Sequence, residues 1–237
     1  MLHEGQGGLG LQRARISAVR GRLRVALGKG VMPGTASRFL GWRMVALAFL
    51  GINFGTYLSG GVFGTIVHDL QTRFDLNRAT VSLCISAQVF AINLSAPLMG
   101  WLATRYSLRK LMFIACATQG TAFLGMGLAN HYEQILVCYA LNGLGYCMFG
   151  AVGPYTLVSR WFEADRAKAM GFMTIPIVLT AAPLLAAPLA IAFGSRGVFF
   201  TVSAIYYLCL PLVLLIVDRP EDVGQTAWRG SDAATAT

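Results

Sequence analysis

The side chains that could do chemistry in this 237-residue sequence are polar groups set inside long apolar runs. Asn53 and Tyr57 are four residues apart, so in a helix they share a face and could hydrogen-bond the same polar group. A second set combines one amide with three phenols: Tyr139, Asn142, Tyr146 and Tyr155. In an apolar environment such groups either bind a polar ligand or form hydrogen bonds between helices, and the sequence leaves both roles open.

Groups that would carry out a reaction are missing from these runs. The histidines, which a serine protease would need at membrane depth, lie in the tail or between the runs: His3, His68 and His131. The cysteines lack metal-ligand spacing and are interpreted as small apolar side chains: Cys84, Cys116, Cys138, Cys147 and Cys209. No ionisable residue lies near the centre of a run, where a charge is costly and marks an ion pathway. We therefore expect no enzyme activity, no cofactor and no metal site.

Six apolar runs must position the polar groups. As helices rising 1.5 Å per residue, each is long enough to cross a hydrocarbon core of roughly 30 Å. The composition agrees, because only 12% of the residues are charged, whereas soluble domains have about a quarter. The sequence predicts an all-α membrane protein with six transmembrane helices, at about 41–67, 79–103, 111–129, 134–159, 170–193 and 198–217. Three prolines make the fifth run the least regular: Pro176, Pro183 and Pro188.

If the six helices cross the membrane one after another, nearly all basic residues lie on one side of it. The N-terminal tail holds eight Lys and Arg, the loops after the second and fourth runs hold three each, and the C-terminal tail holds two, which makes 16. The other three loops hold 3. By the positive-inside rule, both termini are expected in the cytoplasm of a multi-pass protein of the cell (inner) membrane. This topology and the attraction of anionic lipid explain the net charge of +9, so no nucleic-acid partner is expected.

The chain divides into three predicted segments. Residues 1–40 form a basic cytoplasmic tail that is expected to be disordered. Part of it could instead be sequence upstream of the true start codon, which would then be Met32 or Met44. A short helix on the membrane surface is the alternative for this tail, because apolar residues recur at helical spacing: Ile16, Val19, Leu23 and Leu27. Residues 41–217 form the six-helix transmembrane domain. Residues 218–237 form a polar cytoplasmic tail that is expected to be disordered.

The loop between the second and third runs carries a recognisable motif. Residues 100–110 read Gly-Trp-Leu-Ala-Thr-Arg-Tyr-Ser-Leu-Arg-Lys, which resembles the G-x-L-a-D-r-x-G-r-r signature of the major facilitator superfamily of secondary transporters. Thr104 replaces the aspartate of the signature, and Ser107 replaces its second glycine. Three further stretches resemble the same family: 160–171 is similar to its loop between helices four and five, and 74–82 and 219–224 are similar to its monocarboxylate and oxalate/formate-like branches. Together the resemblances cover residues 41–224 and correspond to the N-terminal half of such a transporter.

The resemblance implies a twelve-helix protein whose two six-helix halves rock about a central site, each half being a 3+3 inverted repeat. It implies that helices one and four line the substrate cavity, which makes six residues candidates for solute binding: Asn53, Tyr57, Tyr139, Asn142, Tyr146 and Tyr155. It also implies a conformational gate formed by Gly100, Thr104, Arg105, Arg109 and Lys110. The gate is expected to be weak, because a threonine carries no charge. Many proton-linked members have an arginine where this sequence has Tyr139, so proton coupling within this half is not expected.

The sequence therefore predicts secondary transport of a small organic solute, a carboxylate by branch resemblance, by half of a rocker-switch transporter. Its expected partners are the lipid bilayer, the solute and a second six-helix half, either the missing C-terminal half or another subunit. The alternative is a truncated or degenerate half-transporter without transport activity that acts only as a membrane interaction partner. The departures at Thr104 and Ser107 keep that alternative open.

Overall fold

The computed structural model describes residues 39–229. Residues 1–38 and 230–237 lie outside the described part, and so does nearly all of the predicted basic tail. The residues from Leu40 onward form one compact unit. The regular elements of this described part are helices, and an isolated bridge joins Phe162 to Trp228.

Five segments of the described part are long and apolar enough to cross a membrane. The first contains α2 (Gly41–Ile52), the π-helix η1 (Asn53–Leu58) and α3 (Ser59–Phe74). The second is α4 (Arg78–Arg105) and the third is α5 (Leu108–Leu128). The fourth contains α6 (Tyr132–Gly145), the π-helix η2 (Tyr146–Val152) and α7 (Gly153–Trp161). The fifth contains α8 (Arg166–Met173) and α9 (Ile177–Val213), and a short 3₁₀ helix, η3 (Pro220–Val223), follows it.

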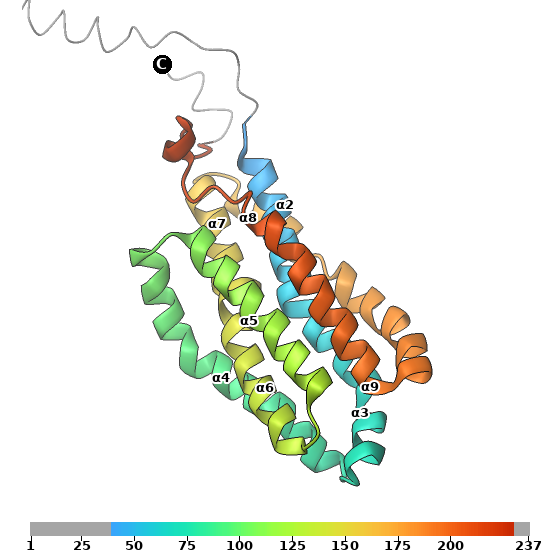
Figure 1. The fold of residues 1–237 in the computed structure, drawn as a ribbon. Helices are drawn as coiled ribbons and strands as arrows, with labels where there is room; N and C mark the ends of the chain where they lie inside the picture. The colour runs from blue at the N-terminus through green and yellow to red at the C-terminus, as the bar shows by residue number, and fades with distance from the viewer. Residues whose placement is uncertain (1–38, 230–237) are drawn as a thin grey trace, which may run out of the picture. The chain divides into compact units, whose positions relative to one another are not determined.

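The fifth segment is interrupted twice. Its 48 residues would reach about 72 Å as one helix, more than twice the thickness of a hydrocarbon core. The first interruption is the stretch 174–176 between α8 and α9. The second is Gly194, where φ is 65° and ψ is −172°, a conformation that glycine adopts without a Cβ clash. The chain turns back at this point, so α9 has a first part, 177–193, and a second part, 195–213 (Figure 1).

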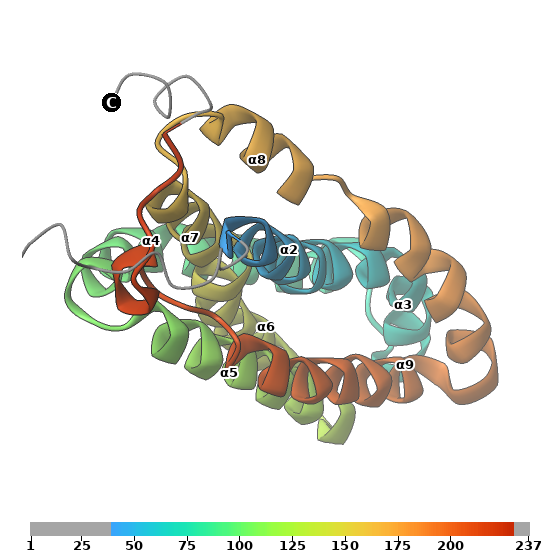
Figure 2. The same cartoon turned by 90° about the horizontal axis from the view of Figure 1, so that it is seen from above.

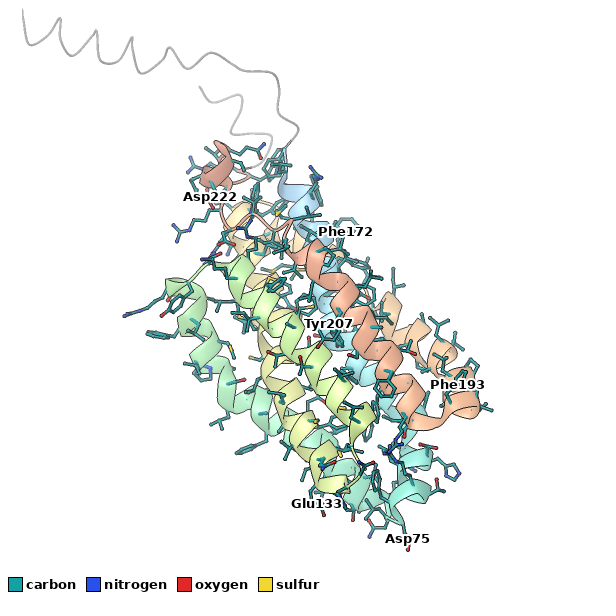
Figure 3. The ribbon with its side chains drawn as sticks, viewed as in Figure 1. Asp75, Glu133, Phe172, Phe193, Tyr207 and Asp222 are labelled. Carbon is teal, nitrogen blue, oxygen red and sulfur yellow. The ribbon has the colours of Figure 1, made fainter. Side chains whose placement is uncertain are left out.

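The helices pack side by side with the first segment in a central place. Seen along the bundle, α2 and α3 run between the first part of α9 on one side and the second part of α9 with α5 on the other (Figure 2). α5 packs along α9, and α4 packs along α6. We call the end with the start of α2 and with η3 the terminal end, and the end with Asp75 and Glu133 the distal end (Figure 3).

The two π-helices cross at a pair of glycines. A Cβ added to Gly55 would lie 2.7 Å from the Cα of Gly150 and 2.8 Å from its backbone nitrogen. The hydroxyl of Thr56 donates to the carbonyl of Gly150 at 2.8 Å. Because apolar burial does not drive helix association in lipid, such close backbone contact is what holds the first and fourth segments together.

A buried polar network joins the helices near this crossing. The Nε2 of Gln119 lies 2.9 Å from the carbonyl of Gly55, 3.2 Å from Oδ1 of Asn142 and 3.3 Å from the hydroxyl of Tyr206. Asn142 in turn donates to the hydroxyl of Ser59 at 2.9 Å. Gln88 of α4 also donates to the hydroxyl of Ser59, at 3.2 Å. With side chains from α3, α4, α5, α6 and α9, the network links all five segments through neutral groups.

Candidate functional site

Asn53 spans the interruption between α8 and α9. It is fully buried at the start of η1. Its Nδ2 donates to the carbonyl of Ile175 at 3.1 Å, and its Oδ1 accepts from the backbone N–H of Val178 at 2.9 Å. A helix end leaves carbonyl and N–H groups without intrahelical partners, and membrane lipid offers them none. One amide therefore satisfies a carbonyl inside the interruption and an N–H in the first turn of α9.

Tyr57 acts on the same interruption one helical turn later. Its hydroxyl donates to the carbonyl of Thr174 at 2.9 Å. Tyr146, at the start of η2, lies beside Thr56 and Tyr57. The structure thus places Asn53 and Tyr57 against residues 174–178, with Tyr146 beside Tyr57, and we call these three side chains and the interruption the break site. It brings an amide, two phenols and the backbone groups of a broken helix together, and these groups can hydrogen-bond a small polar solute if they exchange their present partners.

The other three cavity candidates lie in different surroundings. Asn142 belongs to the buried polar network and bonds Ser59 and Gln119. Tyr139 is buried, and its ring meets the ring of Phe63 edge-on at 5.9 Å. Tyr155 is exposed on α7. The structure therefore brings three of the six predicted cavity residues together at the break site.

The predicted gate residues lie in the last turns of α4 and the first turn of α5. The hydroxyl of Thr104 donates within its own helix to the carbonyl of Trp101, at 2.7 Å. The guanidinium of Arg105 lies over the ring of Trp101, 4.8 Å from its centroid. Gly100 borders open space, since an added Cβ would meet nothing within 4 Å. Arg109 and Lys110 are exposed at the start of α5.

A carboxylate reaches this loop from the far end of the described chain. Asp218 accepts a hydrogen bond from the backbone N–H of Arg109 at 2.8 Å, which caps the start of α5. A negative charge at a helix N-terminus is favourable because it satisfies a free N–H and opposes the helix dipole. Arg160 also ties the loop to α7 by donating to the carbonyl of Ala103 at 2.6 Å. The sequence analysis did not predict that Asp218 caps α5, although Asp218 directly precedes the stretch 219–224 that resembles the family.

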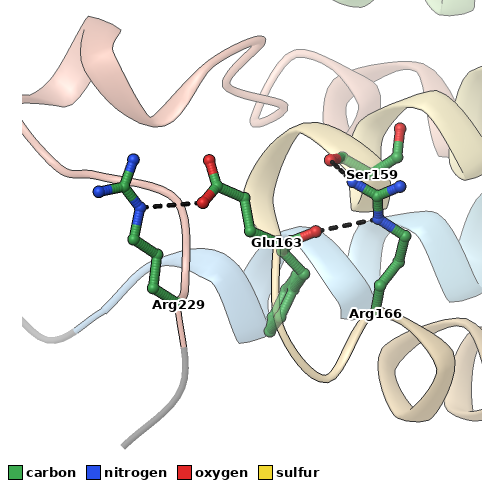
Figure 4. Close-up of polar contacts among 5 residues, drawn as sticks. Ser159, Glu163, Arg166 and Arg229 are labelled. Carbon is green, nitrogen blue, oxygen red and sulfur yellow. Dashed lines mark hydrogen bonds and ion pairs between the residues drawn. The ribbon is translucent and has the colours of Figure 1, made fainter. Parts of the chain in front are cut away.

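Residues 218–229 were expected to be disordered, but the structure shows them attached to the α7–α8 loop. The carbonyl of Trp228 accepts from the N–H groups of Glu163 and Ala164, each at 2.9 Å, and its N–H donates to the carbonyl of Trp161 at 2.9 Å. Arg229 pairs with Glu163 at 2.9 Å (Figure 4). The polar composition predicted a free tail. Instead, the backbone hydrogen bonds of Trp228 attach the tail to the loop.

Asp165 completes this attachment. Its carboxylate pairs with the ammonium of Lys168 at 2.7 Å and accepts from the indole N–H of Trp228 at 3.3 Å. The hydrogen bond from Lys168, followed by that from Trp228, lowers the pKa of Asp165. Arg166 stabilises the same loop by donating to the carbonyl of Ser159 at 3.2 Å (Figure 4).

The comparisons with known proteins agree with this architecture. Residues 30–237 match the family model described as Major Facilitator Superfamily. The chain is 28% identical to Monocarboxylate transporter 7 of Homo sapiens over 127 residues, which are 53% of this chain and 24% of that protein. It is 29% identical to Multidrug resistance protein MdtG of Enterobacter lignolyticus over 177 residues, 69% of this chain and 41% of that protein. Protein spinster homolog 1 of Homo sapiens is 23% identical over 146 residues, 60% of this chain and 26% of that protein.

The matched stretches cover less than half the length of each of these relatives. The family match, by contrast, covers nearly the whole chain, and it agrees with the apolar helices of the structure. The chain is a multi-pass membrane protein with transporters as relatives, and it belongs to the Major Facilitator Superfamily.

Proposed function

We propose that this chain is one half of a secondary transporter for a small organic carboxylate and that the solute binds at the break site. The observation that carries the proposal is the interruption at 174–176, held by Asn53 and Tyr57. Within a membrane, irregular backbone is tolerated only where protein buries it or where it lines a cavity, and transporter sites use such broken helices. The name of one relative, Monocarboxylate transporter 7, supports the choice of solute.

The proposal includes a specific topology. The fifth segment crosses the membrane twice, once on each side of Gly194, which gives six transmembrane helices in a 3+3 inverted repeat. The excess of basic residues at the terminal end supports a cytoplasmic location of this end in the cell (inner) membrane. The second six-helix half then faces this one across the solute.

Transport requires that the hydrogen bonds at the break site be exchangeable. In the structure the hydroxyl of Tyr57 is bonded to a backbone carbonyl and not to another side chain. A solute carboxylate is a stronger acceptor than a carbonyl, so it can take over this donor as α8 and α9 move against η1. The negative charge of the solute is then balanced by the second half and by the N-terminal end of α9.

A direct test is saturable binding of a radiolabelled short-chain monocarboxylate to the purified chain in neutral detergent. The proposal predicts saturable binding that unlabelled carboxylates displace and that the corresponding amides do not. An absence of saturable binding for any small carboxylate would instead favour a degenerate half that only associates with membrane partners.

One observation favours a second candidate, transport of an apolar organic solute. A hollow of about 250 Å³ lies between the first segment and both parts of α9, and its lining is almost wholly apolar. It begins at Phe54 and Leu58 of η1 and reaches Val178, close to the break site. One of the relatives described above, MdtG, is named as a multidrug resistance protein, which agrees with such a solute. Displacement of a bound hydrophobic dye, but not of a carboxylate, would support this candidate over the first.

A further inference from the structure

A second polar site lies at the distal side of the bundle, apart from the break site. A hollow of about 450 Å³ is lined by the end of α3 and the turn of α9: Asp69, Thr72, Arg73, Phe193, Gly194, Ser195 and Arg196. Phe193, labelled in Figure 3, marks its position. Residues from two distant parts of the chain thus face one open space.

Both arginines of this hollow lack a carboxylate partner. Arg73 donates to the carbonyl of Ala129, and Arg196 donates to Oδ1 of Asn130 at 2.9 Å. Within the described residues, no carboxylate oxygen lies within 4.0 Å of either guanidinium. Asp69, the carboxylate that lines the hollow, bonds the backbone instead: its Oδ2 accepts from the N–H of Ser195 at 2.8 Å.

Two donors at this place are buried and have no hydrogen-bond partner. They are Nη1 of Arg73 and the hydroxyl of Ser195. Ser195 is fully buried as a residue and lines the hollow. A buried donor without an acceptor costs about 1–3 kcal/mol, and more when it is charged, so such groups call for a ligand.

The positions of these arginines in the sequence strengthen the argument. Of 19 Lys and Arg residues, only Arg73, Arg78 and Arg196 lie in the loops opposite the basic side. Basic residues are depleted from such loops, yet two of these three meet at one hollow. Together with Asp69 they leave a local charge of +1, and guanidinium groups bind phosphate oxygens with paired, charge-assisted hydrogen bonds.

We propose that this hollow binds a phosphate group, held by Arg73 and Arg196 with the hydroxyl of Ser195 as a third donor. A phosphate offers enough acceptor oxygens for the arginines and the serine together. Two sources share this chemistry: the headgroup of an anionic phospholipid in the surrounding leaflet, and a dissolved phosphate ester. The phosphate would join α3 to both parts of α9 at the turn around Gly194.

The experiment uses the purified, delipidated full chain and two probes. The first is incorporation into phosphatidylcholine nanodiscs with or without phosphatidylglycerol, followed by native mass spectrometry of the retained lipid. The second is titration with glycerol phosphate in neutral detergent. Retention of phosphatidylglycerol alone identifies a lipid headgroup as the source, and binding of glycerol phosphate identifies a dissolved ester. If neither probe binds, the proposal is overturned.

The variants are Arg196→Gln and Arg196→Lys, with Arg78→Gln as the matched control. Arg78 belongs to the same set of loops but lines a different hollow. We expect Arg196→Gln to weaken binding about tenfold and Arg196→Lys to weaken it less, because the ammonium keeps the charge but loses the paired geometry. Arg78→Gln should bind as the unmodified chain does. Equal loss of affinity in Arg196→Gln and Arg78→Gln would show that binding depends only on net charge and would overturn the proposal. A melting curve for each variant distinguishes loss of binding from loss of fold.

Discussion

At the scale of single residues, Asn53 does the most for the broken helix. Its side chain bonds Ile175 inside the interruption and Val178 at the start of α9, and it also donates to the carbonyl of Phe49 at 3.1 Å. Removal of the amide leaves the N–H of Val178 without a partner, whereas the carbonyl of Ile175 keeps the N–H of Ile177 at 3.0 Å. The rigidity of the break site therefore depends on this one side chain.

We predict that Asn53→Ala lowers the free energy of unfolding by about 1–3 kcal/mol, because the N–H of Val178 loses its hydrogen-bond partner. The measurement is thermal or denaturant unfolding of the purified protein in detergent. Asn93→Ala is the matched control, since Asn93 is exposed and bonds only Val89 of its own helix, at 2.9 Å. An equal effect of the two substitutions would contradict the role of Asn53.

The spacing of Asn53 and Tyr57 correctly indicated a shared face, because two polar residues four apart must lie together on a helix. Their partners could not be predicted. The carbonyls of Thr174 and Ile175 become acceptors only because the helix is interrupted there, more than a hundred residues away in sequence. Backbone groups carry no signature of their own in a sequence, so such a contact is visible only in the structure.

At the scale of elements, the crossing of η1 and η2 sets how closely the first and fourth segments approach. The contact is backbone to backbone, so no flexible side chain can move aside to make room at Gly55. Gly64 lies further along the same segment and borders open space. Alanine substitutions at Gly55 and at Gly64 therefore separate the effect of helix packing from that of intrinsic helix propensity.

We expect Gly55→Ala to destabilise the protein by about 1–3 kcal/mol, because an added methyl forces the two helices apart. Gly64→Ala should be neutral or stabilising by up to about 1 kcal/mol, because alanine is the better helix former. Unfolding curves of the two variants in the same detergent decide the matter. A Gly55→Ala variant as stable as Gly64→Ala would show that the crossing is looser than the structure has it.

The elements themselves were largely predictable, and the exceptions have physical reasons. The apolar runs largely coincide with the helices, because a lipid-facing helix must be apolar along its length, although the last run was expected to reach 217 and α9 ends at Val213. Three prolines indicated that the fifth run was irregular, but only Pro176 lies at an interruption, whereas Pro183 and Pro188 are inside α9. A proline is accommodated within a helix when neighbours satisfy the freed carbonyl, and that depends on packing that the sequence does not display.

At the scale of the whole molecule, two helical faces remain without a partner in the described unit. α4 exposes Phe90 and Leu94, and the first part of α9 exposes Leu184 and Ile191. Faces of this kind contact lipid or a second set of helices. The matched stretches span less than half of each relative described above, which agrees with our proposal that a second half completes the transporter.

The most direct test of the account is the affinity of the chain for a short-chain monocarboxylate in Tyr57→Phe compared with Tyr207→Phe. Each substitution removes one phenolic hydroxyl, but Tyr57 bonds the interruption at 2.9 Å, whereas Tyr207 is exposed and its hydroxyl meets that of Thr121 at 3.0 Å. If the solute binds at the break site, Tyr57→Phe should weaken binding about tenfold, the value of one charge-assisted hydrogen bond, and Tyr207→Phe should leave it unchanged. Unchanged affinity in a correctly folded Tyr57→Phe variant would contradict the account and place the solute elsewhere.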